Sequence, residues 1–221
     1  MRIVAISDTH ELHSYVDLPP GKLLIHAGDF TNIGRPPKIE DFLWWLKSLD
    51  YEHIVFIAGN HDITLCPDRS PLPQVREAIL ALFRELPPHI HYLENSGVTI
   101  DGLHIWGSPY SPEFAGWGFM KPDKELSKKI WSKIPKKVDI LVTHGSPASG
   151  YASTNLEGDE CGSYSLARRI KQIKPRVCIF GHIHEGYSTQ RRHDILYINA
   201  SICERNMRPS HDPISFDLES T

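Results

Sequence analysis

The stretch RIVAISDTH, residues 2–10, decides the fold because it joins a short apolar run to a polar cluster. The run at 3–6 is continuous and too short for an amphipathic helix. Such a run is typical of a strand that is buried on both faces of a parallel sheet. Four later stretches repeat this order: KLLIHAGDF (22–30), HIVFIAGNHD (53–62), VDILVTHGS (138–146) and RVCIFGHIH (176–184).

Helical stretches lie between these predicted strands. We predict helices over 38–49 (KIEDFLWWLKSL), 73–86 (PQVREAILALFREL) and 164–173 (YSLARRIKQI), and the second of these has apolar residues at spacings of three and four. Because strands and helices alternate, the strands are expected to pair in parallel.

The pattern changes in two places, where strands follow one another without helices. Residues 97–109 (GVTIDGLHIWGSP) are two alternating runs around Asp101-Gly102, which is a turn dipeptide suited to a tight hairpin. Stretches 194–202 (DILYINASI) and 213–218 (PISFDL) add strands near the end. The sequence therefore predicts an α/β fold whose parallel core also carries antiparallel strands.

Length and composition limit the range of partners. The 221 residues, of which 40% are hydrophobic, fit a single domain over 1–221 with a sizeable core. The net charge is −3, and 24 basic residues face 27 acidic ones without long blocks of one sign. This balance indicates no extended groove for nucleic acid and no attraction to an anionic membrane, so anion recognition must be local.

The sequence also favours a cytoplasmic location. Its first residues lack the basic lead and the apolar stretch of a secretory signal. No apolar run approaches the roughly 18 residues that a membrane-spanning helix needs. The four cysteines show no close pairing of the kind found in disulfide frameworks or zinc knuckles. The oligomeric state is left open.

Side chains of the types that can bind metal ions follow the five predicted strands, where the ligands of open α/β sheets gather. They are Asp8 and His10, Asp29, Asn60 and His61, His144, and His182 and His184. Imidazole, carboxylate and amide ligands without thiolates suit manganese, iron or zinc. The set is too large for one ion that keeps an open position, whereas two ions sharing a carboxylate leave room for a water molecule.

These residues resemble a known family. The motifs DTH (8–10), GDF (28–30), GNHD (59–62), THG (143–145) and GHIH (181–184) resemble, in order and spacing, the calcineurin-like metallophosphoesterases. The resemblance spans 3–187. Within that superfamily the chain looks most similar to the metallophosphoesterase-domain-containing branch, whose members are similar to class III cyclic-nucleotide phosphodiesterases.

The resemblance implies a four-layer αββα sandwich, in which two mixed sheets are flanked by helices, and it implies a ligand set for two ions. The first ion would be held by Asp8, His10, Asp29 and His184. The second would be held by Asp29, Asn60, His144 and His182, with Asp29 as the bridge. Manganese is the first choice, with iron or zinc as alternatives.

The implied activity is hydrolysis of small phosphodiesters, cyclic nucleotides among them. A hydroxide between the two ions would attack phosphorus, and His61 would assist the leaving group. Asn60 and His61 would also contact the substrate phosphate. The alternatives are a catalytically weak nucleotide-binding or regulatory protein, a phosphomonoesterase and a nuclease.

One departure from the resemblance concerns His61. In the phosphoprotein phosphatase branch an Asp orients this histidine and an Arg grips phosphate, but here those positions are Asn32 and Ile33. Asp62 is a poor substitute because neighbours on an extended backbone point to opposite sides. Arg35 could grip phosphate if its loop folds inward. The departure favours small phosphodiesters over phosphoproteins.

The loop at 107–123 is rich in glycine, proline and aromatic residues and is long enough to be functional. Its aromatic residues are Tyr110, Phe114, Trp117 and Phe119. We expect a hydrophobic plug over the sheet edge in preference to a platform that stacks a nucleobase. Whether this loop gates the site is left open.

Overall fold

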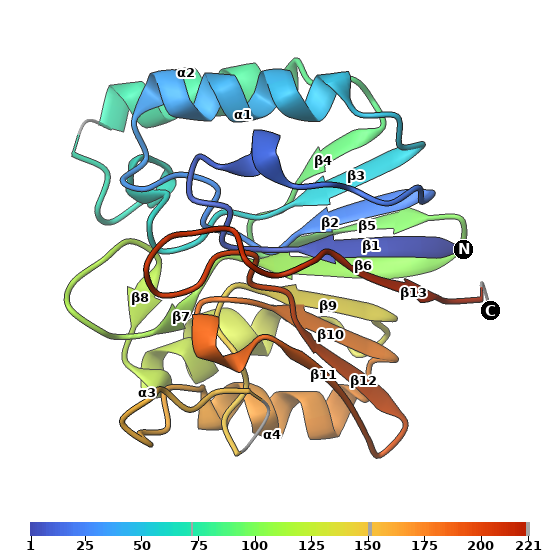
Figure 1. Ribbon diagram of the computed structural model, residues 1–221. Coiled ribbons are helices and arrows are strands. Elements are labelled where there is room, and N and C mark those ends of the chain that lie inside the picture. The colour runs from blue at the N-terminus through green and yellow to red at the C-terminus, as the bar shows by residue number, and fades with distance from the viewer. Residues whose placement is uncertain (72, 150–151, 220–221) are drawn as a thin grey trace.

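One mixed sheet contains the strand with which the chain begins. In the computed structural model, which describes residues 1–71, 73–149 and 152–219, this sheet has the order β13-β1-β2-β3-β4 (Figure 1). Its strands are β1 (Arg2–Ile6), β2 (Leu23–His26), β3 (His53–Phe56), β4 (Ile90–Tyr92) and β13 (Ile214–Asp217). Neighbours from β1 to β4 pair in parallel, and β13 runs antiparallel to β1.

The second mixed sheet has the order β11-β12-β10-β9-β6-β5. Its strands are β5 (Ser96–Ile100), β6 (Leu103–Ser108), β9 (Ile140–Thr143), β10 (Val177–Phe180), β11 (Ser188–Arg192) and β12 (Ile195–Asn199). The predicted hairpin is confirmed: β5 and β6 are antiparallel, and Asp101 and Gly102 between them both have positive φ. A small separate pair joins β7 (Ser111–Pro112) to β8 (Met120–Lys121).

Helices cover the outer faces of both sheets (Figure 1). Helices α1 (Pro36–Ser48) and α2 (Pro73–Arg84) lie on the side of the first sheet. On the side of the second sheet lie α4 (Tyr164–Ile173) and a helical stretch made of α3 (Asp123–Glu125), η3 (Leu126–Ile130) and η4 (Trp131–Lys133). Short turns elsewhere are η1 (His13–Tyr15), η2 (Ile63–Leu65) and η5 (His184–Gly186). The three predicted helices are confirmed, with α4 at the predicted bounds.

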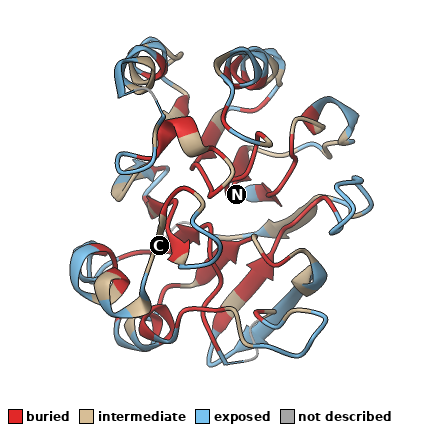
Figure 2. Ribbon diagram, turned by 90° about the vertical axis from the view of Figure 1, so that its left-hand side faces the viewer, coloured by how far each residue is buried: buried red, intermediate tan, exposed pale blue. Residues whose placement is uncertain are grey.

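The five strands predicted from continuous apolar runs, β1, β2, β3, β9 and β10, are buried on both faces except at the first residue of β1 and of β3. In β1, Ile3 and Ala5 join the cluster between the two sheets, whereas Val4 and Ile6 join the cluster beneath the helices. Figure 2 shows that buried residues are concentrated in the central strands, whereas the helices have exposed outer surfaces. The observed layers therefore match the predicted αββα sandwich, and among the described residues no helix is long and apolar enough to cross a membrane.

Candidate dinuclear metal site

The site lies where parallel strands of both sheets end. Segments that follow β1, β2 and β3 in the first sheet meet those that follow β9 and β10 in the second. The backbone turns sharply there, because several residues with side chains in the site have the left-handed conformation. These are Asp8 (φ 53°), His10 (φ 44°), Asp29 (φ 55°) and His182 (φ 69°). Non-glycine residues avoid this region unless the surrounding structure enforces it, and such strain concentrates at functional sites.

The first group of candidate ligands comprises Asp8, His10 and His184, whose ligand atoms all lie within 4.8 Å of one another. Nε2 of His184 is 3.4 Å from Oδ1 of Asp8 and 3.4 Å from Nε2 of His10. Asp8 is completely buried, and His10 is 2% exposed. Buried imidazoles that point their nitrogens at one another and at a carboxylate suit a shared cation.

The second group comprises Asp29, His144 and His182, which meet the same 4.8 Å limit. Nε2 of His144 is 3.2 Å from Oδ2 of Asp29 and 2.9 Å from Oδ1 of Asn60. The rings of His144 and His182 meet edge to face at 5.1 Å. The amide oxygen of Asn60 therefore lies beside the second group, as the predicted ligand set requires.

Hydrogen bonds around the ligands fix their orientation. Nδ1 of His144 lies 2.9 Å from the backbone oxygen of Ala27. Because a carbonyl oxygen can only accept, Nδ1 carries the hydrogen and Nε2 is left to face the site. Asp8 accepts hydrogen bonds from the backbone N–H of His182 and from the Ser201 hydroxyl, the latter at 2.9 Å.

The carboxylates of the site are held in the ionised form. Burial disfavours the charge of Asp8, but the hydrogen bond and charge of His184 outweigh it, so its pKa lies well below the usual value. Burial also disfavours the charge of Asp29, but the charge and hydrogen bond of His144 outweigh it and lower the pKa of this carboxyl below its usual value. Two ionised carboxylates in a buried pocket favour cation binding.

The histidines divide into two kinds. Burial lowers the pKa of His10 and His182 to about 4, so both are neutral and able to ligate at neutral pH. Burial also lowers the pKa of His144, but the carboxylate of Asp29 outweighs it and raises this pKa to about 9. In the same way, the carboxylate of Asp8 raises the pKa of His184 to about 9. A metal ion must displace these protons, because a ligating nitrogen must be free of hydrogen. In ligand type, arrangement and charge the two groups fit two cations.

His61 lies beside both groups and is held differently from them. Its backbone N–H donates to Oδ1 of Asp29 at 2.7 Å, and its Nδ1 lies 2.7 Å from the backbone oxygen of Asn32. Its ring meets His10 edge to face at 4.8 Å and stacks on Trp117 at 4.2 Å. The carbonyl of Asn32 therefore orients His61 from the position at which the phosphoprotein phosphatases have an Asp.

Asp62 does not orient His61. Its carboxylate accepts hydrogen bonds from the backbone N–H groups of Asp29, Gly59 and Thr31, at 3.0, 2.8 and 2.9 Å, and from the Thr31 hydroxyl at 2.7 Å. Burial, followed by the charge of Asp29, raises the pKa of this carboxyl to about 7. Asp62 thus connects the segments that carry Asp29 and Asn60, a role that the sequence reasoning missed.

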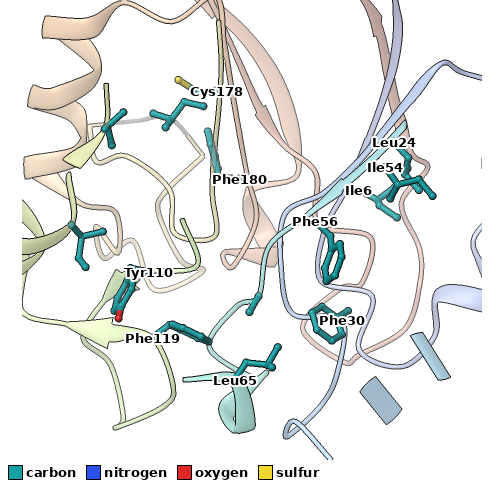
Figure 3. Close-up of a cluster of buried hydrophobic side chains, with 14 of the residues drawn as sticks. Ile6, Leu24, Phe30, Ile54, Phe56, Leu65, Tyr110, Phe119, Cys178 and Phe180 are labelled. Carbon is teal, nitrogen blue, oxygen red and sulfur yellow. The ribbon is translucent and has the colours of Figure 1, made fainter. Parts of the chain in front are cut away.

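The remaining predicted residues are Arg35 and the aromatic residues of the loop at 107–123. Arg35 is exposed and precedes α1. In the loop at 107–123, Tyr110 and Phe119 are buried and meet edge to face at 5.5 Å (Figure 3), so the predicted plug is confirmed for these two residues. Phe114 is 71% exposed, whereas Trp117 lies against His61. The loop therefore contributes to the site through Trp117.

Comparison with known proteins agrees with this geometry. Residues 1–186 match the family described as calcineurin-like phosphoesterase. The chain is similar to metallophosphoesterase domain-containing protein 1 of Homo sapiens, with 38% identity over 98% of this chain and 71% of the relative. It is also similar to the UPF0046 protein C25E10.12 of Caenorhabditis elegans, with 33% identity over 99% of this chain and 81% of the relative.

Solved structures share the fold at much lower sequence identity. The crystal structure of TT1561 of Thermus thermophilus has a TM-score of 0.63 and 15% identity, and the match covers 90% of this chain and 88% of that one. GAP50, described as the anchor in the inner membrane complex of Plasmodium, has a TM-score of 0.51 and 13% identity, and the match covers 91% of this chain and 71% of that one. At these identities the likeness concerns the fold alone.

Proposed function

Because the chain belongs to the calcineurin-like phosphoesterase family, we propose that it hydrolyses small phosphodiesters, cyclic nucleotides among them. Metal-dependent hydrolysis of phosphoesters is the general chemistry of this family. The observation that carries the proposal is the pair of adjacent buried groups, each with one carboxylate and two imidazoles. Two adjacent cation sites of this kind suit in-line displacement at phosphorus.

We assign the ligands according to the two groups. Asp8, His10 and His184 would hold one ion, His144, His182 and Asn60 would hold the other, and Asp29 would bridge them. When bound, the ions supply an activated water molecule and neutralise the charge of the phosphate. We propose manganese, with iron or zinc as alternatives, because the donors are nitrogen and oxygen without thiolate.

His61 is the proposed acid for the leaving group. Because Nδ1 donates to the Asn32 carbonyl, Nε2 is the nitrogen that can exchange a proton. A histidine so placed would protonate the departing alkoxide of a phosphodiester. We further propose that the ions, together with the exposed Arg35 just before α1, supply the positive charge that binds the phosphate.

We also propose that the chain acts in the cytoplasm as a single domain. Its four cysteines are unpaired, and Cys66, Cys178 and Cys203 are buried. Unpaired cysteines agree with a reducing compartment.

The test is turnover by protein that has been stripped with a chelator and reloaded with manganese, iron or zinc. The substrates are bis(p-nitrophenyl) phosphate, p-nitrophenyl phosphate, cyclic AMP and single-stranded DNA. Asp29→Asn removes the proposed bridge, and Asp50→Asn, which changes an exposed carboxylate, is the matched control. We expect two ions per chain by elemental analysis and diester turnover that Asp29→Asn abolishes and Asp50→Asn leaves unchanged.

Other outcomes would point to the alternatives. Faster turnover of the monoester would make the protein a phosphomonoesterase. Cleavage of DNA that weakens steeply with salt would indicate a nuclease. Tight binding of AMP without turnover of any substrate would refute hydrolysis and favour a nucleotide-binding protein.

A further inference from the structure

Within the part of the chain that the structure describes, hydrogen bonding does little to hold the ring of His61. The bond from Nδ1 to the Asn32 carbonyl fixes one ring atom but does not by itself fix the tilt of the ring. The neighbouring carboxylate of Asp62 is engaged by other donors. Packing must therefore supply the rest of the orientation.

Trp117 supplies a flat surface against this ring. The centroids are 4.2 Å apart with 28° between the planes, and the ring of His10 meets that of His61 edge to face with an angle of 88°. Stacked and edge-to-face contacts on one imidazole restrict both its tilt and its rotation. We propose that Trp117 is the positioning residue of His61, which keeps Nε2 aimed at the substrate; this inference rests on the proposed hydrolysis.

The loop at 107–123 holds Trp117 in place. Directly after it, Gly118 donates its backbone N–H to the backbone oxygen of Asn60 at 3.1 Å. Next, Phe119 is completely buried and donates its N–H to Sγ of Cys66 at 3.1 Å. A Cβ on Gly118 would lie 3.0 Å from that same Asn60 oxygen, so the approach of the loop is close. The buried plug thus anchors the loop beside the residue that precedes His61.

This arrangement has a consequence that depends on the leaving group. A weakly acidic leaving group, such as an alcohol or p-cresol, needs a proton from His61 to depart, whereas the more acidic p-nitrophenol leaves as its anion with little help. Loss of Trp117 should therefore slow the hydrolysis of esters with weakly acidic leaving groups and spare that of nitrophenyl esters. We expect kcat for methyl p-tolyl phosphate to fall by about tenfold to hundredfold, a part of the ~10²–10⁴-fold that general acid catalysis contributes, because His61 itself is still present.

The experiment compares Trp117→Leu and Trp117→Phe with Phe114→Leu, a matched control that removes an exposed aromatic residue from the same loop. Each manganese-loaded variant is assayed with methyl p-tolyl phosphate, which releases the weakly acidic p-cresol, and with bis(p-nitrophenyl) phosphate, which releases the more acidic p-nitrophenol. We expect Trp117→Leu to lower kcat for the first substrate alone, with KM unchanged. Trp117→Phe should restore most of kcat, and Phe114→Leu should match the unaltered protein. In a His61→Ala background, Trp117→Leu should have no further effect.

A second readout does not depend on turnover. In metal-free protein the indole ring should shift the ring protons of His61 upfield in NMR spectra, and Trp117→Leu should abolish that shift while far-ultraviolet circular dichroism stays unchanged. Equal losses on both substrates, a change confined to KM, or His61 resonances unaffected by Trp117→Leu would each overturn the inference. If the unaltered protein cleaves neither substrate, the proposed function fails, and the NMR comparison still decides whether Trp117 positions His61.

Discussion

Substituting Gly181 by alanine is the sharpest test of the first cation site. A Cβ at this position would lie 2.0 Å from Oδ2 of Asp8 and 2.2 Å from Oγ of Ser7. Ordinary contact begins at 3.4 Å, so the carboxylate must move by about 1.4 Å. Metal-ligand distances tolerate only about 0.2 Å, so Asp8 can no longer serve an ion held by His10 and His184. We expect Gly181→Ala to lose the first ion and keep the second.

The cost in stability should be moderate. Forcing one methyl group into a packed site typically lowers the free energy of unfolding by ~1–3 kcal/mol. Gly21→Ala is the matched control, because its Cβ would lie 2.8 Å from a methyl group of Val4, away from the metal site. Isothermal titration with manganese and elemental analysis give the number of ions bound, and urea unfolding gives the stability.

One result would refute this reasoning. If Gly181→Ala binds two ions with the affinity of the unaltered protein, Asp8 is not a ligand in the proposed arrangement. If Gly21→Ala lost an ion at an equal cost in stability, the effect of Gly181→Ala would reflect general loosening of the fold.

Further predictions follow from the surroundings of the ligands. The pKa of His144 is raised to about 9, so below that pH a cation must displace a proton from this ring, and metal affinity should rise as the pH rises toward 9. Calorimetric titration in buffers of different ionisation enthalpy measures the protons released on binding. Metal binding without proton release would contradict this prediction. Ser201→Ala removes a hydrogen-bond donor to the buried carboxylate of Asp8 and should lower the free energy of unfolding by ~1.5–3 kcal/mol. Urea unfolding measures this change, and an unchanged midpoint would argue against that bond. Burial raises the pKa of the Cys178 thiol, whereas Cys161 is partly exposed. Alkylation of the native protein should therefore label Cys161 before Cys178, as mass spectrometry can show. Equal labelling of the two would show that the core opens readily.

The parts of the fold that the sequence predicts are those with a strong local signal. Five continuous apolar runs gave buried strands, and the three regular helical patterns gave α1, α2 and α4. Strand β11 was missed because it is exposed along its whole length, so its sequence has no apolar pattern, and β12 provides its partner. Strand β4 has only three residues, too few to show a period.

In the site as well, the sequence predicts the residues that act through distinctive side chains but not the partner that acts through its backbone. The proposed ligands are chemically distinctive and follow the strands directly, so their motifs could be read without the structure. The partner of His61 could not be found, because it is the backbone carbonyl of Asn32, and any residue would offer that atom. The contact with Trp117 was hidden for another reason. It joins positions 56 residues apart whose approach depends on the anchoring of a loop.

Asp62 shows how the position of a carboxylate in a motif can mislead about its role. It stands next to His61, yet its side chain accepts four hydrogen bonds from the two segments that follow β2 and β3. Three of those donors are backbone N–H groups that would otherwise be buried without partners. The carboxylate thereby sets the distance between Asp29 and Asn60, on which two neighbouring cation sites depend. Asp62 is thus a structural requirement of the site, whereas His61 is contacted by the backbone carbonyl of Asn32 and the indole of Trp117.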